Sequence, residues 1–247
     1  MIYKMDLHIH TCLSPCGDSK MIPETVLSHA KMHGLQIIGI SDHNSAENVA
    51  AFKEAGERIG FPVIGGIEVT MLEEIHVLGF FDELENLLQL QDLVYNHLQG
   101  ENDGEAFGEQ YVVDADGFVA RSCRKLLIGA TDLSLEKVLD SIHQLDGIAR
   151  ASHIDRASFS VLSQLGFIPE GIYFDALELS PQAQTDTAEY KNPGIPLVRF
   201  SDSHHPQDIG RSFSVLSLGE PCVAEIRRAL RERRDCKGDG GYLFTYT

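Results

Sequence analysis

Two closely spaced histidines near the start of the chain form the first pattern that predicts chemistry. His8 and His10 are separated by one residue, and along an extended strand such residues face the same side. Histidine is the commonest metal ligand, and carboxylates are its usual companions. A lone His-x-His pair is about as often a surface feature as a metal site, so the interpretation depends on the rest of the chain.

Further histidines and carboxylates follow or end apolar runs that resemble strands. His43 comes directly after one run, Glu68 ends the next, and His76 lies in the one after that. His153 and the pair Asp202-x-His204 follow two later runs. Because the carboxyl ends of strands converge on one face of a parallel α/β barrel, we expect these residues to gather there. A mixed set of histidines and carboxylates suits Zn, Mn or Fe.

The elements that must position these residues alternate between short apolar runs and helical patterns. This alternation predicts parallel βαβ units, arranged as a barrel or an open sheet. Strands are expected at residues 1–7, 35–40, 62–67, 75–81, 147–152, 176–179 and 195–200, with a last edge strand at 238–246. Helices are expected at residues 24–33, 46–59, 84–98, 135–145, 158–165, 183–190 and 224–233.

One stretch, residues 99–131, breaks this alternation. It is polar and rich in glycine, and its Asp116-Gly117 pair lies between β-prone residues, which predicts a hairpin. The segment from Asp114 to Gly117 resembles the start of a calcium loop, but the remaining ligand positions are missing. We therefore expect an insertion or lid within a single barrel domain that spans residues 1–247.

In their order along the chain, these motifs resemble those of the PHP family, which is named for its polymerase-associated and histidinol-phosphatase members. The resemblance covers about residues 5–80 and 147–215. The four motifs that carry it are, in order, His8-x-His10, Ser41-Asp42-His43, Gly66-x-Glu68 with His76, and Asp202-x-His204.

Two further positions match the family pattern with a departure nearby. Asp18 stands five residues before Pro23, as the family's aspartate does, but the segment has two extra residues before Asp18. His153 matches the family's histidine after the fifth strand, whereas Ile154 stands where the family has proline.

The resemblance implies a distorted (β/α)7 TIM-like barrel that holds two to three divalent metal ions (Zn, Mn or Fe). It also implies a hydrolase that cleaves the phosphate ester of a small phosphomonoester or nucleotide, with a hydroxide held between two ions as the nucleophile. It sorts the ligands into one group of His8, His10, Glu68 and Asp202, a second that shares Glu68 and adds His76 and His153, and a third of Asp18, His43 and His204.

Other polar residues near these motifs are candidates for substrate binding and catalysis. Arg156 and Arg211 could hold a phosphate, because a guanidinium binds it in a bidentate manner; the alternative is that they form surface salt bridges. Asp202 or a metal-bound water could supply the proton to the leaving group. Asp42, which precedes His43, could orient a ligand imidazole, or it could cap the following helix.

The charge balance limits the partners. The chain has 20 Lys and Arg against 37 Asp and Glu, which gives a net charge of −17. Such a surface repels long nucleic acids, so we expect a small phosphorylated substrate or at most a short oligonucleotide. The five cysteines and the lack of a long apolar run predict a cytoplasmic protein that does not bind a membrane.

Three other functions are compatible with the pattern. An exonuclease on short oligonucleotides would use the same centre. A deaminase or amidase of the amidohydrolase type also begins with His-x-His, but no candidate for its bridging lysine follows a middle strand. A non-enzymatic metal-binding domain would be expected to have lost ligands, whereas every expected position here holds a competent residue.

Overall fold

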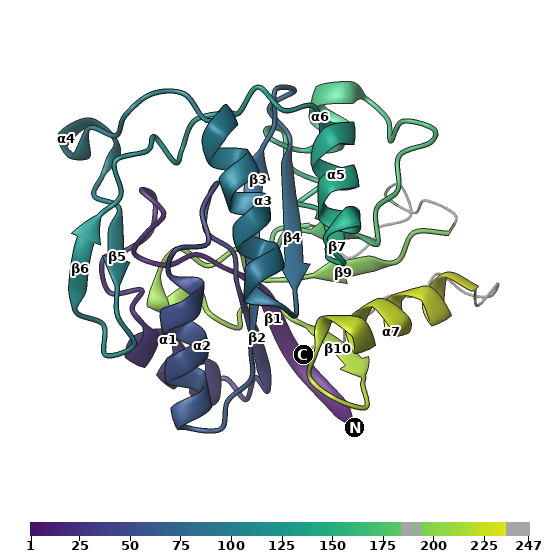
Figure 1. Cartoon of the computed structure of the whole chain (residues 1–247). Coiled ribbons are helices and arrows are strands. Elements are labelled where there is room, and N and C mark those ends of the chain that lie inside the picture. Colours follow the sequence, from purple (N-terminus) through teal and green to yellow (C-terminus); the bar gives the residue numbers. More distant parts are fainter. Residues whose placement is uncertain (184–189, 191–193, 236–247) are drawn as a thin grey trace.

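A curled sheet of eight strands forms the centre of the computed structural model, which describes residues 1–183, 190 and 194–235 (Figure 1). The strand order is β10-β1-β2-β3-β4-β7-β8-β9. Beyond β9, the amide of Ser203 donates to the carbonyl of His8, and the amide of His10 donates to the carbonyl of Ser203, so the sheet nearly closes into a barrel. The strands are β1 (Ile2–Ile9), β2 (Ile37–Ile40), β3 (Val63–Thr70), β4 (His76–Phe81), β7 (Ile148–Ala151), β8 (Ala176–Leu179), β9 (Leu197–Arg199) and β10 (Ser214–Ser217).

The barrel is distorted because two of its strands run against the others. Strands β1 to β3 are parallel, and so are β7 to β9. Strand β4 pairs antiparallel with both β3 and β7, and β10 pairs antiparallel with β1. The expected TIM-like barrel is confirmed, but parallel βαβ units do not extend throughout. Only residues 71–75 join β3 to β4, and a parallel pair needs a crossover of a dozen or more residues.

Helices surround the sheet and close one end of the barrel (Figure 1). The expected helix at 183–190 lies almost entirely outside the described residues, and the expected edge strand at 238–246 lies wholly outside them. Strand β10 was not predicted. Within the described residues, no helix has both the length and the apolar character needed to span a membrane. The helices are α1 (Pro23–Met32), α2 (Val49–Arg58), α3 (Leu84–His97), α4 (Gly104–Phe107), α5 (Leu135–Gln144), α6 (Val161–Leu165) and α7 (Val223–Asp235), with a short 3-10 helix η2 (Pro206–Asp208).

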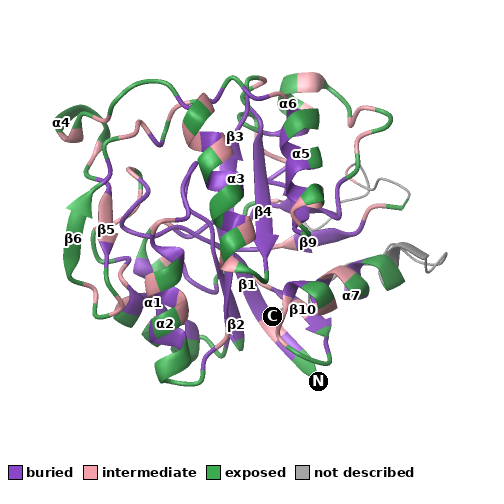
Figure 2. Cartoon of the chain, in the orientation of Figure 1, coloured by how far each residue is buried: buried purple, intermediate pink, exposed green. Residues whose placement is uncertain are grey.

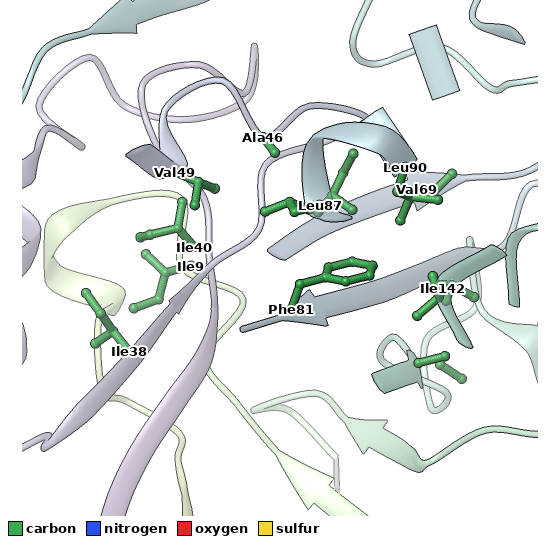
Figure 3. Close-up of a cluster of buried hydrophobic side chains, with 14 of the residues drawn as sticks. Ile9, Ile38, Ile40, Ala46, Val49, Val69, Phe81, Leu87, Leu90 and Ile142 are labelled. Atoms are coloured by element: carbon green, nitrogen blue, oxygen red, sulfur yellow. The ribbon is translucent and has the colours of Figure 1, made fainter. Parts of the chain in front are cut away.

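Alternate residues of the strands pack into two apolar layers, so most of the strand surface is buried (Figure 2). The outer layer lies between the sheet and the helices, where Val69 and Phe81 pack with Val49 of α2 and Leu87 of α3 (Figure 3). The inner layer fills the barrel, and α7 covers its lower end through residues such as Ile226. The inner layer includes Met5, Leu7, Ile64, Leu78, Phe80, Ile148, Ala176, Val198 and Phe200.

A bulge near the end of β1 sets the direction of the two leading histidines. The register between β1 and β2 shifts between Asp6 and Ile9. Leu7 belongs to the inner layer and Ile9 to the outer one, although strict alternation would place both on the same side. The shift therefore turns His8 and His10 toward the barrel axis, as bulges beside active sites often re-aim side chains.

Residues 99–131 contain α4 and the expected hairpin, formed by β5 (Tyr111–Val113) and β6 (Val119–Ser122). The turn includes Gly117 at φ +84°, a conformation that glycine adopts without strain. The segment is bound to loops that follow the barrel strands. The amide of Tyr111 donates to the carbonyl of Cys12, and Asn44 donates to the carbonyls of Leu127 and Gly129.

The close packing of Gly66 on Phe80 gives a test of the barrel interior. A Cβ at Gly66 would lie 2.5 Å from the Phe80 ring and 2.9 Å from the carbonyl oxygen of Gly79. Gly66→Ala should lower the free energy of unfolding by about 1–3 kcal/mol, as overpacking does. In a double-mutant cycle measured by urea unfolding, Phe80→Leu should reduce this cost. Equal costs in both backgrounds would show that the ring is not the obstacle.

Candidate metal centre

The candidate ligands continue the inward-facing rows of the barrel. On β3, Glu68 is two residues beyond Gly66 and four beyond Ile64, which belongs to the inner layer. On the antiparallel β4 the order is reversed, so His76 begins the strand yet lies at the same end of the barrel as Glu68. Asp202 follows the inner-layer residue Phe200 at the same spacing of two. The inward-facing rows therefore carry apolar side chains in the lower part of the barrel, which form its apolar floor, and the candidate ligands in the upper part.

Four side chains meet closely at this centre, all of them buried. The Nε2 atoms of His8 and His10 are 3.2 Å apart. Each lies 3.3 Å from Oδ1 of Asp202 and 3.4 Å from an oxygen of Glu68. Two neutral imidazole nitrogens that face each other with their lone pairs would repel, so this arrangement calls for a cation or a proton between them.

The separation of these atoms fits a tetrahedral metal site. Zinc binds histidine nitrogen and carboxylate oxygen at about 2.0–2.1 Å, which places tetrahedral ligands about 3.3–3.4 Å from one another. The two Nε2 atoms and Oδ1 of Asp202 lie 3.2 to 3.3 Å apart, which matches that geometry, while Glu68 presents Oε1 to His8 and Oε2 to His10 at 3.4 Å. The residues present therefore fit an ion held by His8 and His10 with carboxylate oxygens of Asp202 and Glu68 around it.

A hydrogen-bonded chain behind His10 fixes its orientation. Ser14 Oγ donates to Asp42 at 2.6 Å and therefore accepts from Nδ1 of His10 at 3.0 Å. This leaves Nε2 of His10 to face the carboxylates. Asp42 also accepts from the amide and the hydroxyl of Thr11. Asp42 was predicted to orient a ligand imidazole or to cap the following helix; its carboxylate accepts from Ser14, the partner of His10, and the N-cap of α2 is Asn48.

His8 is held by a buried ion pair that the sequence reasoning missed. Its Nδ1 lies 2.7 Å from Glu178 Oε1, and Glu178 Oε2 lies 2.9 Å from Arg150 Nε. Arg150 sits over the rings of Phe80 and Phe200 and donates to the carbonyl of Leu7. One charged residue in each of two neighbouring apolar strands, β7 and β8, was the signal available in the sequence.

Glu68 is the hub of a second group of histidines. Its Oε1 lies 3.3 Å from Nδ1 of His76 and 3.8 Å from Nε2 of His153, and it accepts a hydrogen bond from Ser152. Its Oε2 lies 3.2 Å from Nδ1 of His43. Buried ring nitrogens normally have partners, but Nδ1 of His43, His76 and His153 has no hydrogen-bond partner. A cation bound beside Glu68 would satisfy Nδ1 of His43 and of His76, whereas His153 approaches Glu68 with its Nε2.

The remaining predicted ligands lie toward the rim. His204 stacks on His10 with ring centroids 4.2 Å apart, and ligand nitrogens of His10, His43 and His204 lie within 4.8 Å of one another. Asp18 is outside this group: its amide donates to the carbonyl of His204, and its carboxylate lies 3.5 Å from Nδ1 of His205. His205 was left out of the predicted ligand set, so its place beside Asp18 is a feature that only the structure reveals.

Burial and charge set the ionisation of the cluster. Burial lowers the pKa of His43 well below its usual value. It lowers the pKa of His153 to about 4 and the pKa of His204 to about 3. Burial alone would raise the pKa of Glu68 and of Asp202, but the surrounding histidines hold both well below their usual range. Near pH 7 His43, His153 and His204 are therefore neutral and both carboxylates are ionised, the forms that bind metals, whereas the carboxylates raise the pKa of His8 and His10 above the usual range against the effect of burial.

The two predicted phosphate-binding arginines are placed differently. Arg156 Nη2 lies 2.7 Å from Asp202 Oδ2, so its guanidinium is at the edge of the centre. Arg211 donates from Nε and Nη2 to the carbonyl of Ser201 and pairs with Asp208. Arg211 thus supports the backbone just before Asp202, and its role in phosphate binding stays a prediction.

Known structures share this barrel. Endonuclease Q of Pyrococcus furiosus, a lesion-specific endonuclease, superimposes with a TM-score of 0.72 at 21% identity over 94% of this chain and 56% of that one. A protein from Bifidobacterium adolescentis, proposed to be a metal-dependent phosphoesterase, gives a TM-score of 0.58 at 21% identity over 92% of this chain and 95% of that one. At these identities the comparisons support the fold.

Sequence comparison places the chain in a family. The model described as the PHP domain matches residues 6–185. The phosphoribosyl 1,2-cyclic phosphate 1,2-diphosphodiesterase of Eggerthella lenta is 34% identical over 79 residues, which cover 30% of this chain and 29% of that enzyme. The chain shares the fold of the protein from Bifidobacterium adolescentis, and its histidines and carboxylates form groups that could hold a metal ion. The chain belongs to the PHP domain family, as the order of its motifs predicted.

The ionisation of His10 predicts that metal binding depends on pH. Burial would lower the pKa of His10, but hydrogen bonds to Asp202 and Glu68 raise it to about 9. Below that pH a metal must displace the proton of His10, and the pKa of His8 is raised too, so apparent affinity for Mn²⁺ should rise at least about tenfold per pH unit from pH 7 to 9. Anaerobic calorimetry in buffers of different ionisation enthalpy would detect the released proton. Affinity that stays constant over this range would contradict the prediction.

The contact between Glu178 and His8 predicts a role for Glu178 in metal affinity. Glu178→Gln should weaken binding of the first metal by about 10–100-fold, because the hydrogen bond that orients His8 loses its charge. Competition with a chelator would measure this loss. Since the variant leaves Arg150 buried without its partner, the double variant Arg150→Met/Glu178→Gln should recover thermal stability but not affinity. Recovery of both would contradict the prediction.

Proposed function

We propose that this protein is a phosphatase for small phosphomonoesters or nucleotides that uses a trinuclear metal centre. The observation that carries this proposal is the convergence of His8, His10, Glu68 and Asp202 at the spacing of a single ion's ligands. Membership of the PHP domain family and the likeness to proteins described as a phosphodiesterase and a metal-dependent phosphoesterase support this reaction class.

The three ions would take three groups of ligands, with His10 in the first group and Glu68 shared by the first and the second. The first would take the four converging side chains just named. The second would share Glu68 and add His76 and His153, which approach Oε1 of that carboxylate. The third would take His43 and His204, with Asp18 from the adjoining loop. His43 also lies within reach of Glu68, so it stands between the second and third groups.

The chain's own residues would bind and orient the phosphate. Bound divalent ions supply Lewis-acid activation of water and of the phosphoryl oxygens. Arg156 would turn part of its guanidinium from Asp202 to a nonbridging oxygen, since it is partly exposed and extends from the edge of the centre. The oxygen of Asp202 freed by that movement would accept a hydrogen bond from the water that gives its proton to the leaving group. Asp42 would keep the His10 loop in place through Ser14.

The size of the substrate follows from charge. The net charge of −17 opposes long polyanions, while the buried site presents positive charge only where ions and Arg156 are located. A small phosphoester, or at most a short oligonucleotide, would reach that site.

A panel of substrates on metal-reconstituted protein tests this function. The panel contains a chromogenic phosphomonoester, histidinol phosphate, mononucleotides, 3′,5′-bisphosphates and short oligonucleotides. We expect two to three bound ions per chain and turnover of the small esters. His8→Ala and Asp202→Ala should each lower kcat/KM by at least about 100-fold, because each removes a ligand of the first ion.

His97→Gln is a matched control, because His97 pairs with Asp132 on the surface of α3. This variant should keep full activity and metal content. Protein that binds no metal after careful reconstitution would overturn the trinuclear centre. Turnover restricted to oligonucleotides would replace the phosphatase with an exonuclease.

A further inference from the structure

The loop from His153 to Ser160 places three different kinds of side chain at one edge of the metal centre. His153 at its start faces Glu68. Three residues later, Arg156 pairs with Asp202 at 2.7 Å. Three residues further, the ring of Phe159 stacks on the imidazole of His76, with centroids 4.7 Å apart and planes inclined by 22°. A candidate ligand, a guanidinium and an aromatic ring therefore come from one short segment.

This loop is held at several points along its length. The amide of Ile154 donates to the carbonyl of Glu178 at 2.8 Å, and Asp155 accepts from both the amide and the hydroxyl of Ser180. At its far end, the amide of His76 donates to the carbonyl of Phe159 at 3.0 Å. A capping box formed by Ser160 and Ser163 then begins α6. The position of the Phe159 ring is therefore fixed by its anchors on β4 and β8.

Phe159 combines exposure with backbone strain. The residue is 41% exposed although His76, beneath its ring, is only 8% exposed. Its φ of +54° is unusual for a bulky residue, and such outliers cluster at functional sites. Single exposed apolar residues are ordinary, but this one contacts a candidate ligand. The ring therefore stacks on His76 while a large part of the residue remains exposed beside the centre.

We propose that Phe159 forms a stacking subsite for a planar ring of the substrate, so that the preferred substrates are nucleotides rather than sugar phosphates without a base. This inference rests on the proposed phosphatase function. A nucleobase presents a flat π-face that stacks on an aromatic side chain whatever its hydrogen-bonding pattern. With Arg156 at the phosphate and Phe159 six residues beyond His153, the loop would bind both ends of a compact nucleotide.

The test compares AMP with ribose 5-phosphate, which share the sugar and the phosphate and differ in the base. On metal-reconstituted protein, Phe159→Leu should lower kcat/KM for AMP about tenfold, mainly through KM, and change that for ribose 5-phosphate less than about twofold. Phe159→Tyr keeps the π-face and should stay within about threefold of the parent on both. Calorimetry of adenosine binding, which involves no phosphate, should show the same loss in Phe159→Leu and its rescue in Phe159→Tyr.

Metal content separates stacking from a structural role, and Phe159→Leu should bind as many ions as the parent. An equal loss on both substrates, or a loss of metal, would overturn the proposal and make Phe159 a cover for His76. No preference of the parent protein for AMP over ribose 5-phosphate would also overturn it, while leaving the phosphatase function intact. Failure of the reconstituted parent to hydrolyse any small ester would instead be a failure of the proposed function.

Discussion

The close approach of two imidazole nitrogens to two carboxylates, all of them buried, is the constraint on which the rest of the structure depends. His8 and His10 face each other at 3.2 Å between Glu68 and Asp202, all buried. Unpaired charges and facing lone pairs are costly in such a place, so the groups must be held by other interactions and share a cation or protons. Asp202 and His153 both have positive φ, which indicates that their positions are imposed by the surrounding structure.

The ion pair of Arg150 and Glu178 joins this centre to the apolar floor of the barrel. Arg150 lies on the rings of Phe80 and Phe200, and Glu178 reaches upward to His8. The pair connects the two layers, because the Arg150 guanidinium lies over the rings of the floor and the Glu178 carboxylate orients His8. The Asp42 and Ser14 chain does the same for His10 from the loop side. Each histidine of the pair thus presents Nε2 inward for a separate reason.

Much of the site could be predicted from the sequence because its signal is local. His8-x-His10, Glu68 and Asp202-x-His204 stand at strand ends, and the short apolar runs locate those ends within a few residues. Glu178 and Arg150 could not be found in this way, because each is one polar residue in a strand and their meaning lies in being adjacent across β7 and β8. Likewise, the stacking of Phe159 on His76 could not be predicted, because the two residues are far apart in the sequence.

The sequence by itself determined the family, the residue types of the centre and the end of the barrel at which they lie, because alternation along a strand and the order of motifs are properties of one chain segment at a time. The tertiary structure decided which nitrogen of each histidine faces inward and which carboxylate is shared. It also decided that β4 runs backward, so that His76 reaches the centre from the start of a strand. These depend on distances between segments far apart in the chain, which bulges, short connections and buried ion pairs fix together.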